Sequence, residues 1–329
     1  MYKKNKHTYN ITNGVDMVQK TNEKNQTQNK ASLQHHGVFR TADDHVEIYF
    51  EVYGQGQSII CNNGVGVSTF FWKYILEHYG QNHQIILWDY RGHGKSDKKI
   101  SHLTTDLSIE RHAKDLAELR QHLQQEFDIH PSPALLIGHS MGCQVSLEYW
   151  RQNPDLVQGM VLLLGTAGRA LETFANSSNS VYVFRGVKRI SNKIGPRINK
   201  VIAPLLNSPI AWPFTQKAAL VDPLYTSQQD FAPYLEHLAS MDFLVFLEAA
   251  WQCQLHDIWD ELPNIQVPVL MVAAENDAFT PISCAQKLTQ NIPKSEFMVL
   301  ADGSHAALIE QPQTINFRID RFIRDHNLL

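Results

Sequence analysis

The sequence predicts an α/β protein with a doubly wound, mostly parallel sheet, and two observations lead to this prediction. Short apolar runs alternate with longer stretches whose apolar residues recur at helical spacing, which is the pattern of repeated strand–helix–strand units with right-handed crossovers. The chain has 329 residues, of which 43% are hydrophobic and 19% charged, so it is long enough to bury a large core and carry an insertion.

Residues 1–35 are expected to form a disordered polar tail. They are rich in Lys, Asn, Gln and Thr and contain too few large apolar residues to offset the entropy of ordering. No apolar segment follows the first lysines, as a secretory signal would require, and no run is apolar for long enough to span a bilayer. The expected location is therefore the cytoplasm.

The core is expected over residues 36–165 and 263–329, with eight strands. The predicted strands are 38–41, 46–53, 58–61, 84–89, 134–137, 160–164, 267–272 and 296–300, and the first two form an antiparallel hairpin. Helices are predicted over 70–76, 108–127, 144–152, 282–290 and 307–325.

The strand–helix alternation stops between residues 166 and 262, where we predict a helical lid insertion. Its helices are expected to break at prolines, among them Pro204, Pro213 and Pro233. The segment contains enough aromatic residues to roof an apolar pocket, although most of them are expected to pack the insertion against the sheet. The substrate-binding residues within it stay unknown at this level.

A basic amphipathic stretch within the insertion permits two interpretations. Apolar residues recur at helical spacing from Val181 to Leu205, and no acidic residue occurs between Glu172 and Asp222. Such a stretch fits peripheral contact with an anionic membrane, and it equally fits an ordinary lid helix with a solvated basic face. The cations that fill the gaps, and that are expected to face outward, are Arg185, Lys188, Arg189, Lys193, Arg197 and Lys200.

The run Gly138-His139-Ser140-Met141-Gly142 carries the clearest chemical signal. It lies between a short apolar strand and a predicted helix, so the chain must turn sharply at Ser140. Gly138 and Gly142 lack the Cβ atoms that would clash in such a turn, and the Ser140 hydroxyl is expected at the carboxyl edge of the sheet. A five-residue pattern also arises by chance, but the strand before it and the helix after it favour Ser140 as a nucleophile.

A serine nucleophile needs a base within hydrogen-bond reach and an acid that orients this base. Asp277 follows one predicted strand and His305 follows the next, so both are expected in loops at the sheet edge that carries Ser140. Glu275 and Asp302 are rival acids, because the first lies nearer its strand end and the second is almost beside His305.

Two further histidines lie within motifs, and both are interpreted as structural. His93 and His139 occupy positions at which the chemistry has no need of an imidazole. The four cysteines, Cys61, Cys143, Cys253 and Cys284, are far apart and are expected to be small buried hydrophobic residues. We expect no metal and no organic cofactor, and the net charge of −4 gives no case for nucleic acid as a partner.

The order Ser, Asp, His, each after a different strand, resembles the α/β-hydrolase superfamily over residues 38–325. The run from Asp89 to Ser96, DYRGHGKS, is similar to a turn of that family, as are the acid loop that begins at Asp277 and the histidine loop HAALIEQP that begins at His305. The resemblance implies an eight-stranded sheet of α/β-hydrolase type, and it favours Asp277 over its rivals.

The resemblance also implies an oxyanion hole made of two backbone N–H groups. Met141 would supply the first donor, and Val65, in the loop after the third strand, would supply the second. Many members have His-Gly before the second donor, whereas this chain has Asn63-Gly64, so the residue that supports the loop differs from the family pattern.

These observations predict a serine hydrolase that cleaves carboxylic esters with a hydrophobic acyl or alcohol part, an esterase or lipase-like enzyme. The triad would be Ser140, His305 and Asp277, and the reaction would pass through an acyl-enzyme. Carbon–carbon bond hydrolases, acyltransferases and perhydrolases share this triad and stay open as alternatives. A ligand receptor that keeps the fold but turns over slowly is the alternative outside the enzymes.

Overall fold

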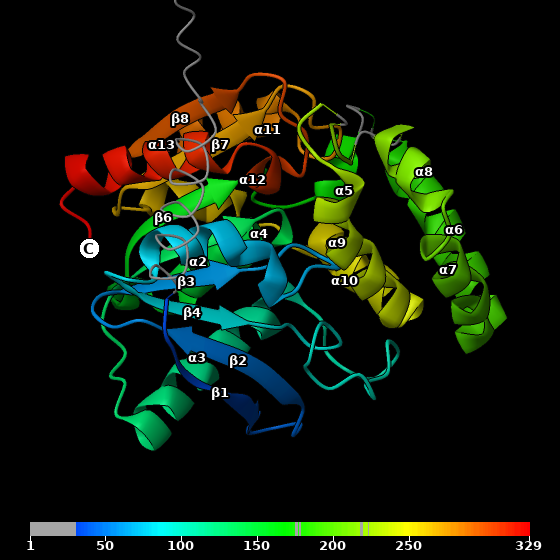
Figure 1. The fold of residues 1–329 in the computed structure, drawn as a ribbon, viewed down its shortest axis with the longest axis horizontal. Helices are drawn as coiled ribbons and strands as arrows, with labels where there is room; N and C mark the ends of the chain where they lie inside the picture. The colour runs from blue at the N-terminus through cyan, green and yellow to red at the C-terminus, as the bar shows by residue number, and fades with distance from the viewer. Residues whose placement is uncertain (1–30, 175–176, 178, 218–219, 223) are drawn as a thin grey trace, which may run out of the picture.

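The computed structural model describes residues 31–174, 177, 179–217, 220–222 and 224–329, so residues 1–30 of the predicted tail lie outside the described residues. Within them one sheet has the strand order β1-β2-β4-β3-β5-β6-β7-β8 (Figure 1). The strands are β1 (Leu33–Arg40), β2 (Glu47–Tyr53), β3 (Ser58–Asn62), β4 (Gln84–Trp88), β5 (Ala134–His139), β6 (Val157–Leu163), β7 (Val269–Ala274) and β8 (Ser295–Leu300). Only β2 runs against its neighbours in this sheet, which confirms the mostly parallel eight-stranded prediction.

The first strand begins earlier than predicted. β1 begins at Leu33 rather than Val38, so residues 33–35 belong to the sheet and not to the tail. Backbone pairing with β2 holds this segment, for example between Leu33 and Tyr53. The side chains at the start of β1 are exposed or half-buried, so no alternation of apolar and polar residues marks where the strand begins.

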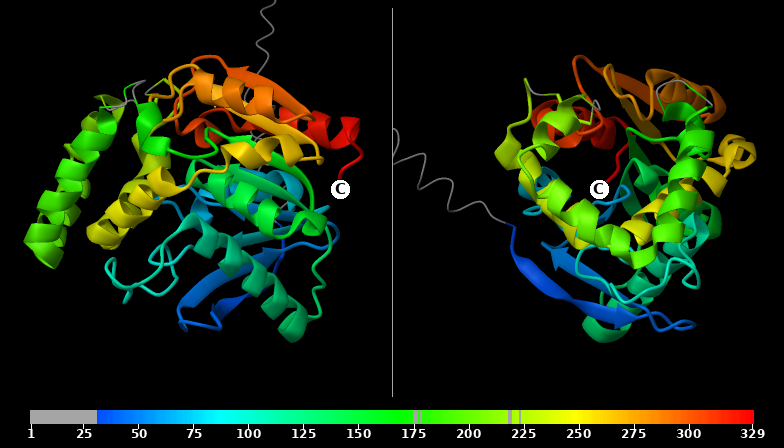
Figure 2. Two further views of the ribbon diagram at one scale, coloured as in Figure 1. Left: turned by 180° about the vertical axis from the view of Figure 1, so that it is seen from behind. Right: turned by 90° about the vertical axis from the view of Figure 1, so that its right-hand side faces the viewer.

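Helices cover both faces of the sheet (Figures 1 and 2). Leu136 on β5 packs towards Leu116 on one face, whereas its neighbour Leu135 packs towards Ile319 on the other, because successive side chains of a strand alternate. The first face carries α3 (Ile109–Phe127), α4 (Met141–Gln152) and α11 (Ile282–Asn291), and the second carries α2 (Lys73–Tyr79) and α13 (Pro312–Asp325). The strands in the middle of the sheet are thus buried on both sides.

One predicted helix is divided at a proline, and three helices continue through prolines that were expected to end them. The single helix predicted over 307–325 is two helices, α12 (Ala307–Glu310) and α13, because Pro312 disfavours helical geometry at Gln311. Conversely, the expected breaks at Pro204, Pro213 and Pro233 are wrong, since each lies inside a helix. Pro213 is in a first turn, where the missing N–H has no intrahelical partner to lose.

The segment between β6 and β7 is helical, as expected. Its helices are α5 (Ala170–Thr173), α6 (Ser180–Ile194), α7 (Asn199–Leu206), α8 (Ala211–Lys217), α9 (Gln228–Ser240) and α10 (Phe243–Leu255), with 3₁₀ turns over Gly195–Ile198 and Trp259–Asn264. In Figures 1 and 2, α6, α7 and α8 form the outermost layer, and α9 and α10 lie between them and the sheet. Leu262 in the last 3₁₀ turn packs in the main core, so the end of the predicted insertion is part of that core. No helix in the described part of the chain is long and apolar enough to cross a membrane.

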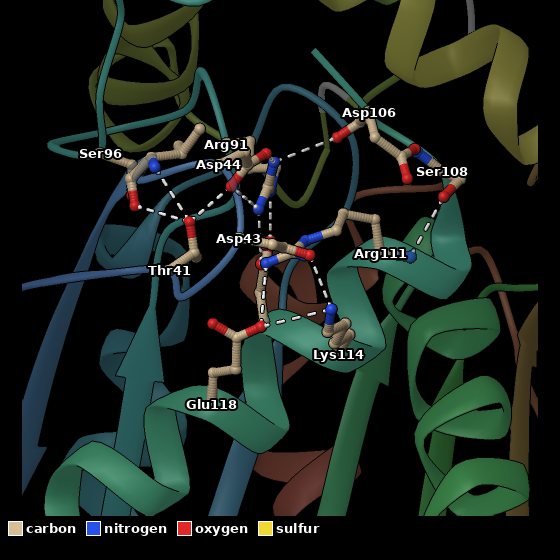
Figure 3. Close-up of polar contacts among 12 residues, drawn as sticks. Thr41, Asp43, Asp44, Arg91, Ser96, Asp106, Ser108, Arg111, Lys114 and Glu118 are labelled. Atoms are coloured by element: carbon tan, nitrogen blue, oxygen red, sulfur yellow. Dashed lines mark hydrogen bonds and ion pairs between the residues drawn. The ribbon is translucent and has the colours of Figure 1, made fainter.

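A cluster of ion pairs around two buried arginines holds the loop after β4 (Figure 3). The Arg91 guanidinium is fully buried and donates to Asp115 on α3 at 2.6 and 2.8 Å, and to Asp44 in the β1–β2 turn. Arg111 on α3 pairs with Asp115 and with Asp43 of the same turn. The cluster thereby joins the hairpin, α3 and the Tyr90–Ser96 turn.

Candidate active site

Ser140 lies at a strained turn between β5 and α4. Its backbone has φ 54° and ψ −117°, a region that residues other than glycine rarely adopt, and the helix begins directly after it, at Met141. A Cβ on Gly142 would lie 1.9 Å from the carbonyl oxygen of Asn62, and one on Gly138 would lie 2.3 Å from that of Gly142. The two glycines therefore permit close backbone approach, while the positive φ falls on the serine itself.

The structure brings the three residues of the predicted triad together at the carboxyl edge of the sheet. The Nε2 atom of His305 lies 3.0 Å from the Oγ of Ser140, and its Nδ1 lies 2.9 Å from Oδ2 of Asp277. His305 lies between β8 and α12, and Asp277 follows β7, so three separate strand ends supply the series. Serine, imidazole and carboxylate in this order can move a proton from the hydroxyl to the ring.

The environment of Asp277 keeps its carboxylate ionised. Burial alone would raise the pKa of Asp277, but the charge and hydrogen bond of His305 together with hydrogen bonds from Thr280 outweigh it and lower the pKa. The Thr280 hydroxyl donates to Oδ2 at 2.7 Å, and the N–H groups of Phe279 and Thr280 donate to Oδ1 at 2.8 and 3.0 Å. These bonds fix the carboxylate so that it can orient the His305 ring.

The rival acids lie elsewhere. Glu275 accepts a hydrogen bond from the backbone N–H of Asp302 at 3.2 Å, and both side chains are exposed. His139 is buried, and its Nε2 donates to the backbone carbonyl of His305 at 3.0 Å. Burial lowers the pKa of His139 to about 3, so its ring is neutral and supports the loop that carries His305.

Asn63 supports the loop that was expected to complete an oxyanion hole. It accepts from the indole N–H of Trp72 at 2.6 Å and donates to the backbone carbonyl of Trp88 at 2.6 Å. Val65 and Met141 both line the cavity beside Ser140. The side chain that differs from the family pattern is thus fully buried and hydrogen-bonded on both sides, which holds the backbone of this loop against the serine turn.

His237 on α9 connects the same loop to the turn after β4, a contact that no local pattern around His237 indicates. Its Nδ1 donates to the carbonyl of Gly66 at 2.9 Å, and its Nε2 accepts from the N–H of Gly94 at 2.7 Å. Burial lowers the pKa of His237, so the neutral ring satisfies both contacts with one tautomer.

An apolar cavity of about 420 Å³ opens at Ser140. The core contributes Val65, Met141 and Phe279, and the insertion contributes Leu171, Phe174, Val183, Phe184, Val187 and Phe246. The ring of Phe279 lies 4.9 Å from that of His305, so apolar surface reaches the candidate catalytic groups directly. Because these side chains come from distant parts of the chain, the sequence could indicate a pocket but not its lining.

A serine at a strand–helix elbow on a sheet of this topology defines the α/β hydrolase class. The model of the α/β hydrolase fold family matches residues 58–312, and the chain belongs to that family.

Relatives and solved structures agree with this assignment. The chain is 26% identical over 270 residues to RutD of Azorhizobium caulinodans, which is named a putative carbamate hydrolase, and the match covers 82% of this chain and 92% of RutD. An esterase from Thermogutta terrifontis has TM-score 0.69 at 22% identity, covering 89% and 99% of the two chains. An enol-lactonase from Burkholderia xenovorans has TM-score 0.65 at 18% identity, covering 85% and 97%. The two structures show a shared fold, and the protein is a hydrolase.

Proposed function

We propose that the protein hydrolyses carboxylic esters that have an apolar acyl or alcohol part, with Ser140, His305 and Asp277 as its catalytic triad. The observation that supports this most is the hydrogen-bonded series of the three residues, whose serine lines an apolar cavity. The volume of about 420 Å³ suits a medium-length acyl chain rather than a small polar substrate.

The proposed reaction has two halves. The Ser140 oxygen attacks the ester carbonyl while His305 takes the hydroxyl proton, and the backbone N–H groups of Val65 and Met141 stabilise the oxyanion. His305 then protonates the leaving alcohol, which breaks the ester bond and leaves Ser140 acylated. Water, deprotonated by His305, attacks the acyl-enzyme, and the acid is released with Ser140 restored.

Carbamate hydrolysis is the second candidate, because RutD relatives are named for it. The same triad could attack a carbamate carbonyl, but the apolar lining of the cavity favours an ester with a hydrocarbon chain. We also place the protein in the cytoplasm, since its four cysteines are all buried free thiols.

The test is turnover of p-nitrophenyl esters of graded chain length, with a p-nitrophenyl carbamate in parallel. We expect hydrolysis that is fastest at medium chain length, and no turnover or fluorophosphonate labelling in Ser140→Ala. Faster release from the carbamate would favour the second candidate. Labelling that survives Ser140→Ala would place the nucleophile elsewhere, and stoichiometric release without turnover would favour a receptor.

A further inference from the structure

The outer face of the insertion exposes an unusual amount of apolar surface. Among the described residues, eleven of the seventeen exposed large apolar side chains lie between residues 182 and 225. On α6, Val183, Val187, Ile190 and Ile194 share one face, because they recur at helical spacing, and Ile190 is 61% exposed. Four further exposed apolar side chains lie on α7, just before α8 and on α8: Val201, Leu205, Ile210 and Phe214. These eight residues are called the outer apolar face below.

Cations lie beside this face. No acidic residue occurs from 173 to 221, whereas seven Lys or Arg residues do. Not all of the α6 cations point outward, as was expected from the sequence. The Lys188 side chain is only 20% exposed, pairs with Glu248 at 2.6 Å and lies over the Trp251 ring. Arg189, Lys193 and Arg197 are exposed. The solvent-facing side of α6 therefore combines an apolar strip with positive charge.

We propose that the outer apolar face docks on an anionic membrane surface. A helix with an apolar face, flanking cations and no acids lies in the headgroup region, where it buries the apolar side chains and attracts anionic lipids. A second copy of the chain would bring like charges together, which disfavours it as the occupant. The arrangement in Figures 1 and 2 permits docking, since α6, α7 and α8 are the outermost layer and the sheet lies behind them.

Docking would open the cavity towards the lipid. Val183 and Val187 are exposed on the outer apolar face, and both also line the cavity that ends at Ser140. An acyl chain could thus pass from the bilayer between these side chains without crossing water. This second part rests on the proposed function, because it takes Ser140 as the nucleophile and an ester as substrate, whereas the docking itself does not.

The test is flotation of the full chain with phosphatidylcholine vesicles, with and without 30 mol% phosphatidylglycerol, at low and high salt. The charge variant is Arg189→Gln with Lys193→Gln, and the apolar variant is Ile190→Gln with Ile194→Gln; neither pair lines the cavity. The matched controls lie on α13, at the other side of the molecule in Figure 1: Arg321→Gln with Arg324→Gln, and the exposed Phe317→Gln. Residues 1–30 are the same in every protein, so differences report on the insertion.

We expect the native chain and the α13 controls to float with anionic vesicles at low salt and to be released as the salt rises. Each cation near the surface contributes about fivefold in partitioning, so the charge variant should bind about 25-fold more weakly. The apolar variant should bind at least about tenfold more weakly. Flotation of both insertion variants at the native level, or none by the native chain, would overturn the proposal. A native dimer that the apolar variant converts to monomer without weaker flotation would also overturn it.

Activity measurements separate this proposal from the proposed function. Both insertion variants should hydrolyse a soluble butyrate ester at the native rate but lose turnover of a long-chain ester dissolved in anionic vesicles. If the native chain floats but hydrolyses neither ester, the proposed function fails and docking stands. If the variants bind weakly yet hydrolyse the vesicle ester at the native rate, the direct route from lipid to cavity is wrong.

Discussion

Asp277 holds His305 through one short hydrogen bond, and this bond predicts a large kinetic effect. In Asp277→Asn, the ring loses both its fixed orientation and the charge that stabilises its protonated form, so kcat should fall about 10³- to 10⁴-fold with the fold intact. The measurement is steady-state hydrolysis of p-nitrophenyl butyrate. The exposed Asp302 is the matched control, and Asp302→Asn should be silent. A large loss of kcat in Asp302→Asn together with a nearly normal kcat in Asp277→Asn would contradict the assignment of Asp277 as the acid of the triad.

His237 is a positioning residue, because it touches the candidate oxyanion loop and not the reacting atoms. His237→Leu removes the donor to Gly66 and the acceptor from Gly94, so the loop should loosen and kcat should fall about tenfold with KM nearly unchanged. His237→Gln keeps one donor and one acceptor and should restore much of the rate. If kcat falls equally in both variants, or if only KM rises, the ring only fills space and does not position the loop.

The serine turn depends on how closely α4 approaches β3. In Gly142→Ala, the new Cβ would lie 1.9 Å from the Asn62 carbonyl oxygen, so the start of α4 must move away from the loop that carries Val65. We expect at least about a 100-fold loss of kcat, because both proposed oxyanion donors are displaced. Gly186→Ala on α6 is the control, since its Cβ meets nothing within 4 Å, and it should raise the unfolding free energy by about 0.5–1 kcal/mol. Kinetics and thermal melts check both, and a normal kcat in Gly142→Ala would contradict the argument.

Local signals explain why the helices, strands and serine turn could be predicted. Ser140 was recognisable because its glycines, apolar strand and helix are consecutive in the chain, and Asp277 and His305 each follow a strand. The early start of β1 at Leu33 was missed because backbone pairing, which leaves no side-chain pattern, holds that segment. Residue type alone predicts a helix break at each proline, but Pro213 costs little because it lies in the first turn of α8.

Across the whole molecule, what could not be predicted is which side of a helix meets which neighbour. The spacing of Val187 and Ile190 indicated an apolar face on α6, but not that both side chains are exposed. Phe279 lines the cavity because the acid loop lies against the insertion, and this contact joins segments about a hundred residues apart. Similarly, His237 reaches Gly66 across 171 positions of sequence. Such contacts are properties of packing and leave no local signal.

Three buried histidines are expected to make the fold less stable in acid. Burial lowers the pKa of His93 and His139 to about 3 and that of His112 well below its ordinary value, so all three are neutral when folded. An unfolded histidine has a pKa of about 6.5 and binds a proton that the folded state rejects. The free energy of unfolding is therefore unaffected by these histidines above about pH 6.5. It falls as the pH drops from there towards the pKa of the folded state.

Between pH 7 and pH 5 each of these histidines should lower the free energy of unfolding by up to about 2 kcal/mol, or about 6 kcal/mol together. This is a large part of the stability of a typical protein. We expect the melting temperature to fall by about 10 °C between pH 7.5 and pH 5. Both ring nitrogens of His112 lack a partner among the described residues, so His112→Leu should reduce this fall by about a third. The exposed His130→Gln is the control and should leave the slope unchanged. If the melting temperature falls equally with pH in the native chain, His112→Leu and His130→Gln, groups other than the buried histidines determine the stability in acid.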